Sequence, residues 1–241
     1  MCVIYLALDQ HPGFPLILLA NRDEFYARRT LAAHFWTDAP DIYAGRDLEA
    51  GGTWLGVTRS GRFAAVTNYR DPFAPTGSRS RGELVADFLK SNDGPNNYVA
   101  KISRRSDEYS GFNLIVGEIS SSGQEVVYYS NRGGVAQQLV SGLYGLSNHL
   151  LDTPWPKVMK GKERVRTLLT HSTLESAKYF EILADKTLAQ NDELPSTGIP
   201  FDLEKSISAI FIETPGYGTR CSTILTFDNE MQWNLDEKTW V

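Results

Sequence analysis

Cysteine is nearly absent from this sequence of 241 residues, which contains only Cys2 and Cys221. Two cysteines are too few for the disulfide framework of a small secreted protein. The sequence also lacks the Asn-x-Ser/Thr motif that accepts N-linked glycans. We therefore expect a protein of the cytoplasm or of another reducing compartment.

Long hydrophobic runs are missing as well. The longest, residues 3–8 and 15–20, are separated by charged and turn-forming residues, and neither approaches the roughly 20 residues of a membrane-spanning helix. Residues 2–20 contain no lysine or arginine and are interrupted by Pro12 and Gly13, so we do not expect a secretory signal peptide. No membrane span is predicted.

An excess of positive charge is also lacking, since the formal net charge is −5. Proteins that bind nucleic acid generally carry a basic face, so nucleic acid is not an expected partner, although a local basic patch stays open. The sequence has no phosphate-binding loop, no Gly-x-Ser-x-Gly elbow and no Cys/His cluster with metal-ligand spacing. We therefore predict no metal site.

The sequence does contain enough apolar material for a large core. Hydrophobic residues make up 41% of the chain and charged residues 22%, which is typical of globular proteins. No internal repeat or low-complexity tract is visible, and residues 187–201 are at most a long loop. We expect a single domain over residues 1–241.

The first two strands are expected to form a hairpin. Residues 2–8 and 16–21 are apolar at nearly every position and are separated by turn residues, which predicts paired strands buried on both faces. This pairing places Cys2 near residues 21–24. Further strands are expected at 53–58, 62–69, 112–118, 126–130, 136–140, 144–147, 208–213, 221–227 and 231–235.

Helical spacing of apolar residues predicts two pairs of helices. One pair lies within residues 81–105, its second helix at 96–105, and the other pair lies at 154–169 and 174–185. Strand groups alternate with these pairs, which predicts an α/β (α+β) fold: a four-layer αββα sandwich of two mainly antiparallel sheets flanked by helices. A doubly wound parallel sheet fits less well, because its strands alternate singly with helices.

Cys2 directly follows the initiator methionine, and removal of that methionine makes Cys2 the chain terminus. Its thiol has a reference pKa of about 8.5 and its freed α-amine one of about 8, so part of the amine is neutral and can take the thiol proton. One residue then supplies both nucleophile and base. The alternative is a small apolar residue that opens a buried strand.

The tetrapeptide at residues 21–24 follows the second strand directly, at a position where functional sites commonly gather. Arg22 and a carboxylate of Asp23 or Glu24 can orient a thiolate or bind an acyl oxygen there. The alternative is a solvated turn that carries a helix start.

Other polar residues flank later strands. Asn68 and Asn148 each follow one, where their amides can donate to a developing oxyanion, and Arg220 precedes one. The alternatives are two turn residues and a surface ion-pair partner.

This combination resembles the cysteine N-terminal-nucleophile hydrolases, especially the penicillin V acylase and bile-salt hydrolase group, whose fold is an αββα sandwich. The resemblance implies that Cys2 is the nucleophile and base and that Arg22 and Asp23 hold and polarise it. That group places its aspartate a few residues beyond the arginine, so Glu24 can also fill the role of Asp23. The resemblance further implies oxyanion and amine contacts from Asn68 and Asn148, and an electrostatic partner of the thiolate in Arg220.

Motifs along the whole chain resemble the NRDE family, also called the transport and Golgi organisation family. They are the Met-Cys start, NRDEFYAR at 21–28, GGTWLGV at 51–57, VTNYRDP at 66–72, SRG at 80–82, FNLIVG at 112–117, GLSN at 145–148, DTPWPK at 152–157 and GTRCSTIL at 218–225. Members of this family are linked to haem trafficking, lipid metabolism and coenzyme A binding. The resemblance therefore implies haem or coenzyme A as a ligand.

Two functions follow as expectations. The first is a cysteine hydrolase that cleaves an amide or thioester bond of an acyl-conjugated small molecule and requires no cofactor. The second is a carrier that binds haem or acyl-coenzyme A without turnover. In either case we expect the substrate site to include Asn21, Glu24, Trp54, Tyr69 and Arg70. The sequence does not determine the oligomeric state.

Overall fold

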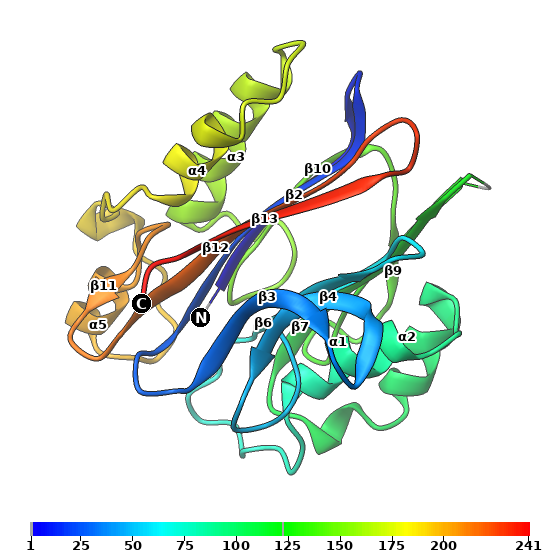
Figure 1. Ribbon diagram of the computed structural model, residues 1–241. Helices are drawn as coiled ribbons and strands as arrows, with labels where there is room; N and C mark the ends of the chain where they lie inside the picture. The colour runs from blue at the N-terminus through cyan, green and yellow to red at the C-terminus, as the bar shows by residue number, and fades with distance from the viewer. Residues whose placement is uncertain (1, 122) are drawn as a thin grey trace. The chain divides into compact units, whose positions relative to one another are not determined.

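The computed structural model describes residues 2–121 and 123–241, and the chain divides into two compact units. The first unit comprises residues 1–27, 70–72 and 141–241, and the second comprises residues 28–69 and 73–140. Each unit is built on one antiparallel sheet with helices against it (Figure 1). The single domain over residues 1–241 stays a prediction.

The described residues of the first unit form a six-stranded sheet in the order β10-β1-β2-β12-β11, with β13 also paired to β12. The predicted hairpin of the first two strands is confirmed, because β1 and β2 pair antiparallel. The first seven residues of β1 are all buried, as expected for a strand covered on both faces. The strands are β1 (Cys2–His11), β2 (Phe14–Phe25), β10 (Gly142–Leu146), β11 (Glu213–Thr214), β12 (Tyr217–Phe227) and β13 (Trp233–Thr239).

Two helices cover one face of this sheet. Helix α3 (Pro156–Leu169) packs on β1 and β10, and α4 (Ser176–Leu183) packs on β2 and β12 (Figure 1). Alternate strand residues such as Val3 and Tyr5 point into the apolar core under these helices. Helix α3 begins later than predicted because Trp155 is its N-cap and Pro156 takes the first helical position, where a missing N–H costs nothing.

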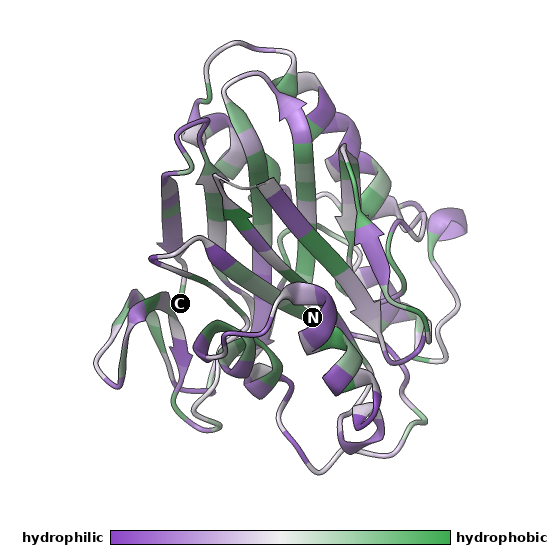
Figure 2. Ribbon diagram, turned by 90° about the vertical axis from the view of Figure 1, so that its right-hand side faces the viewer, coloured by the Kyte–Doolittle hydropathy of each residue, from purple (hydrophilic) through white to green (hydrophobic). Residues whose placement is uncertain are grey.

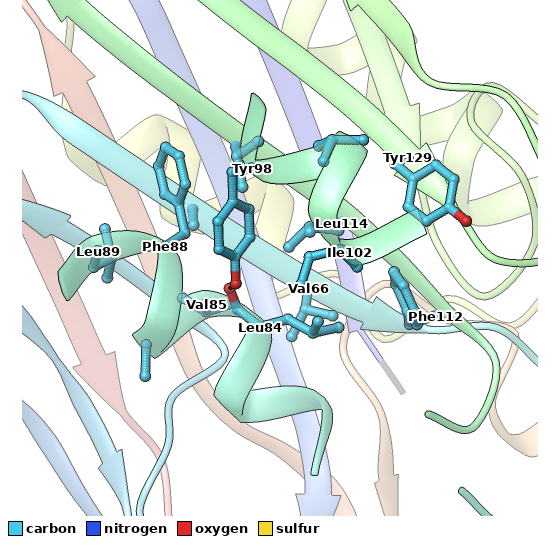
Figure 3. Packing of buried hydrophobic residues seen from close by; sticks show 14 of the residues in the cluster. Val66, Leu84, Val85, Phe88, Leu89, Tyr98, Ile102, Phe112, Leu114 and Tyr129 are labelled. Atoms are coloured by element: carbon cyan, nitrogen blue, oxygen red, sulfur yellow. Dashed lines mark hydrogen bonds between the residues drawn. The ribbon is translucent and has the colours of Figure 1, made fainter. Parts of the chain in front are cut away.

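The described residues of the second unit form a seven-stranded sheet in the order β3-β4-β5-β6-β7-β8-β9. Helix α1 (Arg81–Lys90) packs on β5 and β6, and α2 (Pro95–Ser103) packs on β8. Figure 3 shows the core between these helices and the sheet, where Tyr98 donates a hydrogen bond to the Leu84 carbonyl at 2.7 Å. The strands are β3 (Thr30–Trp36), β4 (Ala39–Asp47), β5 (Leu55–Thr58), β6 (Arg62–Asn68), β7 (Phe112–Ser120), β8 (Gly123–Ser130) and β9 (Gln137–Leu139), and a short 3-10 turn, η1, spans Ser106–Glu108.

Strands β3 and β4 were not individually predicted. Their pairing shifts register between Leu31 and His34 and again between Phe35 and Trp36. Each shift interrupts the alternation of apolar and polar residues by which a strand is found in a sequence.

Figure 2 shows that hydrophobic residues, in green, recur along the strands, while the connecting loops are mainly white or purple.

The predicted strand at 208–213 is wrong, since only Glu213 and Thr214 of this region form a strand, β11. Backbone groups of the preceding segment instead bond side chains: the Ile207 carbonyl, the Ile210 carbonyl and the Ile212 amide each do so.

The loop predicted at 187–201 contains a short 3-10 turn, η2 (Asn191–Glu193), and is followed by helix α5 (Phe201–Ser206). None of the helices formed by the described residues has both the length and the apolar composition that crossing a membrane requires.

Candidate active site

Cys2 is the first residue of β1 and pairs directly with Arg22 of β2. On the other side of β2, Arg22 pairs with Cys221 of β12. Directly opposed residues of antiparallel strands project to the same face, so the two thiols flank Arg22 on one face of the sheet. The predicted proximity of Cys2 to residues 21–24 is confirmed.

Residues 21–24 lie inside β2 rather than after it, which corrects the predicted strand end. The strand continues because β12 pairs with it as far as Phe25. Asn21, Arg22 and Asp23 are buried, with exposed fractions of 0%, 8% and 3%. The alternation of β2 places Asn21 and Asp23 on the face that the helices cover and Arg22 on the opposite face.

Asn21 is fully used by the protein itself. Its amide nitrogen donates to the carbonyls of Leu183 and Ile210 at 2.8 and 2.9 Å, and its oxygen accepts a bond from Ser222 at 2.6 Å. These bonds tie the end of α4 and the irregular segment before β11 to the sheet. Its assignment to a substrate site stays a prediction.

The Asp23 carboxylate is held by hydrogen bonds from β12. The Thr219 hydroxyl donates to it at 2.7 Å and accepts a bond from the Ile212 amide at 2.9 Å, while the Tyr217 hydroxyl donates to the Asp23 carbonyl at 3.2 Å. Burial raises the pKa of Asp23, whereas the charge of Lys157 and the Thr219 hydrogen bond lower it.

The Cys2 thiol is buried and its pKa is raised, mainly because burial disfavours the thiolate. The negative charge of Asp23 acts in the same direction, whereas a hydrogen bond with the Asp23 backbone and the charge of Arg22 lower this pKa. The resting thiol is therefore protonated, and attack on a carbonyl requires a base that takes its proton.

Asn148 is linked to Cys2 through the side chain of Ser147. The Ser147 hydroxyl is within hydrogen-bonding distance of the Cys2 carbonyl, at 3.1 Å, and of the Asn148 side-chain oxygen, at 3.2 Å. Asn148 is fully buried just beyond β10, and its carbonyl accepts a bond from the Arg70 amide at 2.7 Å. Its role toward an oxyanion or amine stays a prediction.

Arg70 forms a buried ion pair with Glu204 of α5, and its guanidinium lies 4.7 Å from the ring centre of Trp155. Thr197 donates to the other Glu204 oxygen at 2.7 Å. Arg70, Glu204 and Trp155 line a small depression together with Lys157. The Glu204 carboxylate neutralises the Arg70 guanidinium. The predicted role of Arg70 in substrate binding stays a prediction.

Arg220 lies at a bulge in the pairing of β12 with β2, between Thr219 and Cys221. Its guanidinium donates to the carbonyls of Phe25, Tyr26 and Val241 at 2.9, 3.3 and 3.2 Å. It thus ties the end of the chain to the end of β2, and its role toward the thiolate stays a prediction.

Glu24, on the same strand as Arg22, makes an ion pair with it at 3.9 Å. Glu24 also accepts a hydrogen bond from the Phe25 amide at 2.9 Å. Of the two carboxylates that could take the aspartate role, Asp23 is the buried one.

Three predicted site residues belong to the second unit. Asn68 is the last residue of β6 and pairs with Phe112, and the Tyr69 amide donates to the Gly111 carbonyl at 2.9 Å. Trp54 packs against the apolar core of that unit. The roles of Asn68, Tyr69 and Trp54 toward Cys2 stay predictions.

Four polar residues around this site were not singled out from the sequence: Lys157, Thr219, Ser147 and Glu204. The first three lie in the motifs DTPWPK, GTRCSTIL and GLSN, so the motifs marked their positions. Lys157 is 4% exposed, and burial lowers its pKa to about 8. No sequence signal marks Glu204, because its partner Arg70 is 134 residues away.

Comparison with known proteins agrees with the motifs. The family model for Transport and Golgi organisation 2 matches residues 1–241. The chain is 37% identical over 263 residues to the Transport and Golgi organization protein 2 homolog of Bos taurus, covering 99% of this chain and 93% of the relative. Its identity to the Homo sapiens homolog is 36% over 256 residues, with the same coverage of 99% and 93%.

A solved structure shares the fold. The Caenorhabditis elegans N-acylethanolamine-hydrolyzing acid amidase ortholog superposes with a TM-score of 0.53 at 11% identity, covering 93% of this chain and 92% of that chain. This likeness confirms the predicted αββα, N-terminal-nucleophile-hydrolase-like fold class. From the matched family model and the two relatives, the chain belongs to the Transport and Golgi organisation 2 family.

Proposed function

We propose that this protein is a cysteine N-terminal-nucleophile hydrolase that cleaves an amide or thioester bond of an acyl-conjugated small molecule. The observation that carries the proposal is the placement of Cys2 at the start of β1, paired with Arg22 and beside Asp23 and Asn148. The C. elegans protein of similar fold is by name an ortholog of an acid amidase that hydrolyses N-acylethanolamines. An N-acyl amide is therefore the first substrate class to test.

The reaction begins with removal of Met1, a residue that lies outside the described part of the chain. The freed Cys2 α-amine takes the thiol proton while the sulfur attacks the acyl carbonyl, so the buried site never holds a free thiolate at rest. Asn148 donates to the oxyanion in this scheme. The ammonium returns the proton to the leaving amine or thiol, and water then cleaves the acyl-thioester and releases the carboxylic acid.

The test is hydrolysis of N-acyl amides and acyl-coenzyme A thioesters by wild type and Cys2→Ala. We expect Cys2→Ala to lose about 10³-fold or more of kcat/KM. The matched control is Cys221→Ala, which removes a second buried thiol paired with the same Arg22 and is expected to keep turnover within about threefold. Undiminished hydrolysis by Cys2→Ala would refute the proposal.

A second candidate is a carrier of haem or acyl-coenzyme A, and the raised pKa of the buried Cys2 thiol favours it. A protonated thiol is a poor nucleophile, and a carrier needs no nucleophile. Titration with haem and with acyl-coenzyme A tests this function directly. Saturable binding that survives Cys2→Ala, without turnover in wild type, supports the carrier, and absence of binding to both ligands removes it.

A further inference from the structure

The turn that carries Ser147 and Asn148 is closed by two hydrogen bonds between Gly145 and Asp152. The Asp152 amide donates to the Gly145 carbonyl at 2.8 Å, and the Gly145 amide donates to the Asp152 carboxylate, also at 2.8 Å. These bonds lie at the outer edge of the sheet, because β10 is an edge strand. Gly145 and Asp152 are the first residues of the motifs GLSN and DTPWPK, and the reaction proposed above uses no residue of the second motif.

Asp152 is suited to close this turn. Its backbone has a φ of 57°, in the left-handed region that aspartate and asparagine adopt more readily than most residues with a Cβ. The Lys162 ammonium of α3 donates to the same Asp152 oxygen at 2.6 Å. Gly145 permits this approach, because an added Cβ would lie 2.8 Å from the Lys162 side chain. One aspartate thus fastens the turn both to the edge of β10 and to α3.

The closed turn holds two buried residues that reach the nucleophile. The Ser147 hydroxyl lies 3.1 Å from the Cys2 carbonyl and 3.2 Å from the Asn148 side-chain oxygen. The Asn148 carbonyl also accepts the bond from the Arg70 amide. Strand β10 ends at Leu146, so its regular pairing with β1 stops before Ser147. Beyond the strand, these single hydrogen bonds and the closure of the turn fix where Asn148 lies.

We propose that Asp152 is a positioning residue of the candidate active site: by closing the turn on Gly145, it holds the Asn148 amide where it donates to the oxyanion formed at Cys2. The proposal rests on the hydrolase function proposed above. The bonds of Asp152 go to Gly145 and Lys162, so its effect on the reaction passes through the turn. A displacement of about 1 Å in a catalytic group is enough to slow a reaction about 100-fold.

Two substitutions separate the hydrogen bond from the charge. Asp152→Asn keeps a side-chain oxygen that accepts from Gly145 and loses the charge, whereas Asp152→Gly also suits a positive φ but has no acceptor. Both change an exposed side chain and are expected to fold.

The first readout is hydrolysis of N-acyl amides and acyl-coenzyme A thioesters. We expect Asp152→Gly to lower kcat about 10- to 100-fold with KM within about threefold of wild type, because the oxyanion forms only in the reaction. Asp152→Asn is expected to keep kcat within about threefold. Equal losses in the two variants, or an unchanged kcat in Asp152→Gly, would overturn the proposal.

The matched control is Asp9→Gly. Asp9 also has a positive φ, 52°, but lies near the end of β1 opposite to Cys2, so kcat is expected to stay within about threefold of wild type. A second comparison places Asp152→Gly in an Asn148→Ala background. There we expect no further loss of kcat, because the group that Asp152 positions is gone. The same loss in both backgrounds would show that Asp152 does not act through Asn148.

A readout without turnover separates this proposal from the proposed function. In ¹⁵N-labelled protein, the side-chain amide resonances lost in Asn148→Ala assign Asn148. We expect them to move in Asp152→Gly and to keep their wild-type positions in Asp152→Asn and Asp9→Gly. Unmoved Asn148 resonances in Asp152→Gly would overturn the proposal. If wild type hydrolyses nothing, the hydrolase function fails, while these resonances still decide whether Asp152 positions Asn148.

Discussion

Cys2 and Arg22 are directly opposed residues of the antiparallel strands β1 and β2, and the same register brings Cys221 against Arg22 from β12. Because β2 lies between β1 and β12, it presents its polar segment to both neighbours at once. The face of the sheet away from the helices receives Arg22 between two thiols, and the helix-covered face receives Asn21 and Asp23. One short run of sequence thus supplies both a candidate reactive site and its structural support.

Asn21→Ala is expected to destabilise the fold. The change leaves the buried carbonyls of Leu183 and Ile210 without their donor, at a cost of about 3 kcal/mol in the free energy of unfolding. Urea denaturation measures the difference. The matched control is Asn97→Ala on an exposed position of α2, expected within about 0.5 kcal/mol of wild type. Equal losses in both variants would contradict this account of Asn21.

Gly161→Ala is expected to destabilise α3 although alanine favours helix. An alanine Cβ here would stand 2.0 Å from ring and hydroxyl atoms of the buried Tyr5. Overpacking of this kind costs about 1–3 kcal/mol or more, which exceeds the gain of about 1 kcal/mol in helix propensity. Gly13→Ala is the control, because its Cβ would make ordinary contacts at 3.6 Å. A thermal melt in which Gly161→Ala is as stable as wild type would show that Tyr5 can move aside.

Glu204→Ala is expected to cost about 3–5 kcal/mol in the free energy of unfolding, because it leaves the buried Arg70 guanidinium without its counter-charge. The double variant Arg70→Met, Glu204→Leu should recover much of that loss. The control pair is Lys186 and Glu213, whose side chains are 56% and 66% exposed. There Glu213→Ala is expected to cost about 0.5 kcal/mol or less in the same denaturation experiment. Similar costs for the two single variants would contradict the burial argument.

Asp185 should contribute stability that depends on pH. Partial burial acts to raise its pKa, but hydrogen bonds from Lys160 and Thr187 outweigh burial and lower the pKa to about 2. A folded-state pKa below the unfolded value stabilises the protein above that value, so the contribution is present above about pH 4 and is lost between about pH 4 and pH 2.

The measurement for Asp185 is urea denaturation of wild type and Asp185→Asn across this pH range. We expect a difference of about 1–2 kcal/mol near neutral pH, after allowance for solvent screening, that disappears at the acid end. The control is Asp107→Asn at an exposed position, which is expected to unfold within about 0.5 kcal/mol of wild type near neutral pH. A difference for Asp185→Asn that does not change with pH would contradict the assignment.

Regular apolar patterns made much of the fold predictable. The strands 2–8 and 16–21, the helix pairs and the antiparallel pairing all follow from runs that repeat at strand or helix spacing. Strands β3 and β4 were not predicted, because irregularities between Leu31 and His34 and between Phe35 and Trp36 disturb that spacing. The segment before β11 looked like a strand because it is apolar, but the carbonyls of Ile207 and Ile210 and the Ile212 amide bond side chains. Its link to β12 is a hydrogen bond from the Thr219 amide to the Ile212 carbonyl.

The candidate site was predictable only in part. Cys2 and Arg22 could be brought together because a hairpin fixes their register. The ion pair of Arg70 with Glu204 and the buried Lys157 could not, since both depend on contacts between residues far apart in the chain. Residues 21–24 were predicted to follow the second strand because they are polar, whereas they lie inside β2. Hydrogen bonds with α4, β12 and the segment before β11 allow Asn21 and Asp23 to be buried there.

The most direct test of the account is the intact mass of the protein before and after exposure to a long-chain acyl-coenzyme A. The spectrum is recorded under non-reducing, mildly acidic conditions that preserve thioesters. We expect a chain without Met1 that gains one acyl group, and we expect this adduct to form in Cys221→Ala but not in Cys2→Ala. A chain that keeps Met1, or a processed chain that never acylates, would contradict Cys2 as an N-terminal nucleophile.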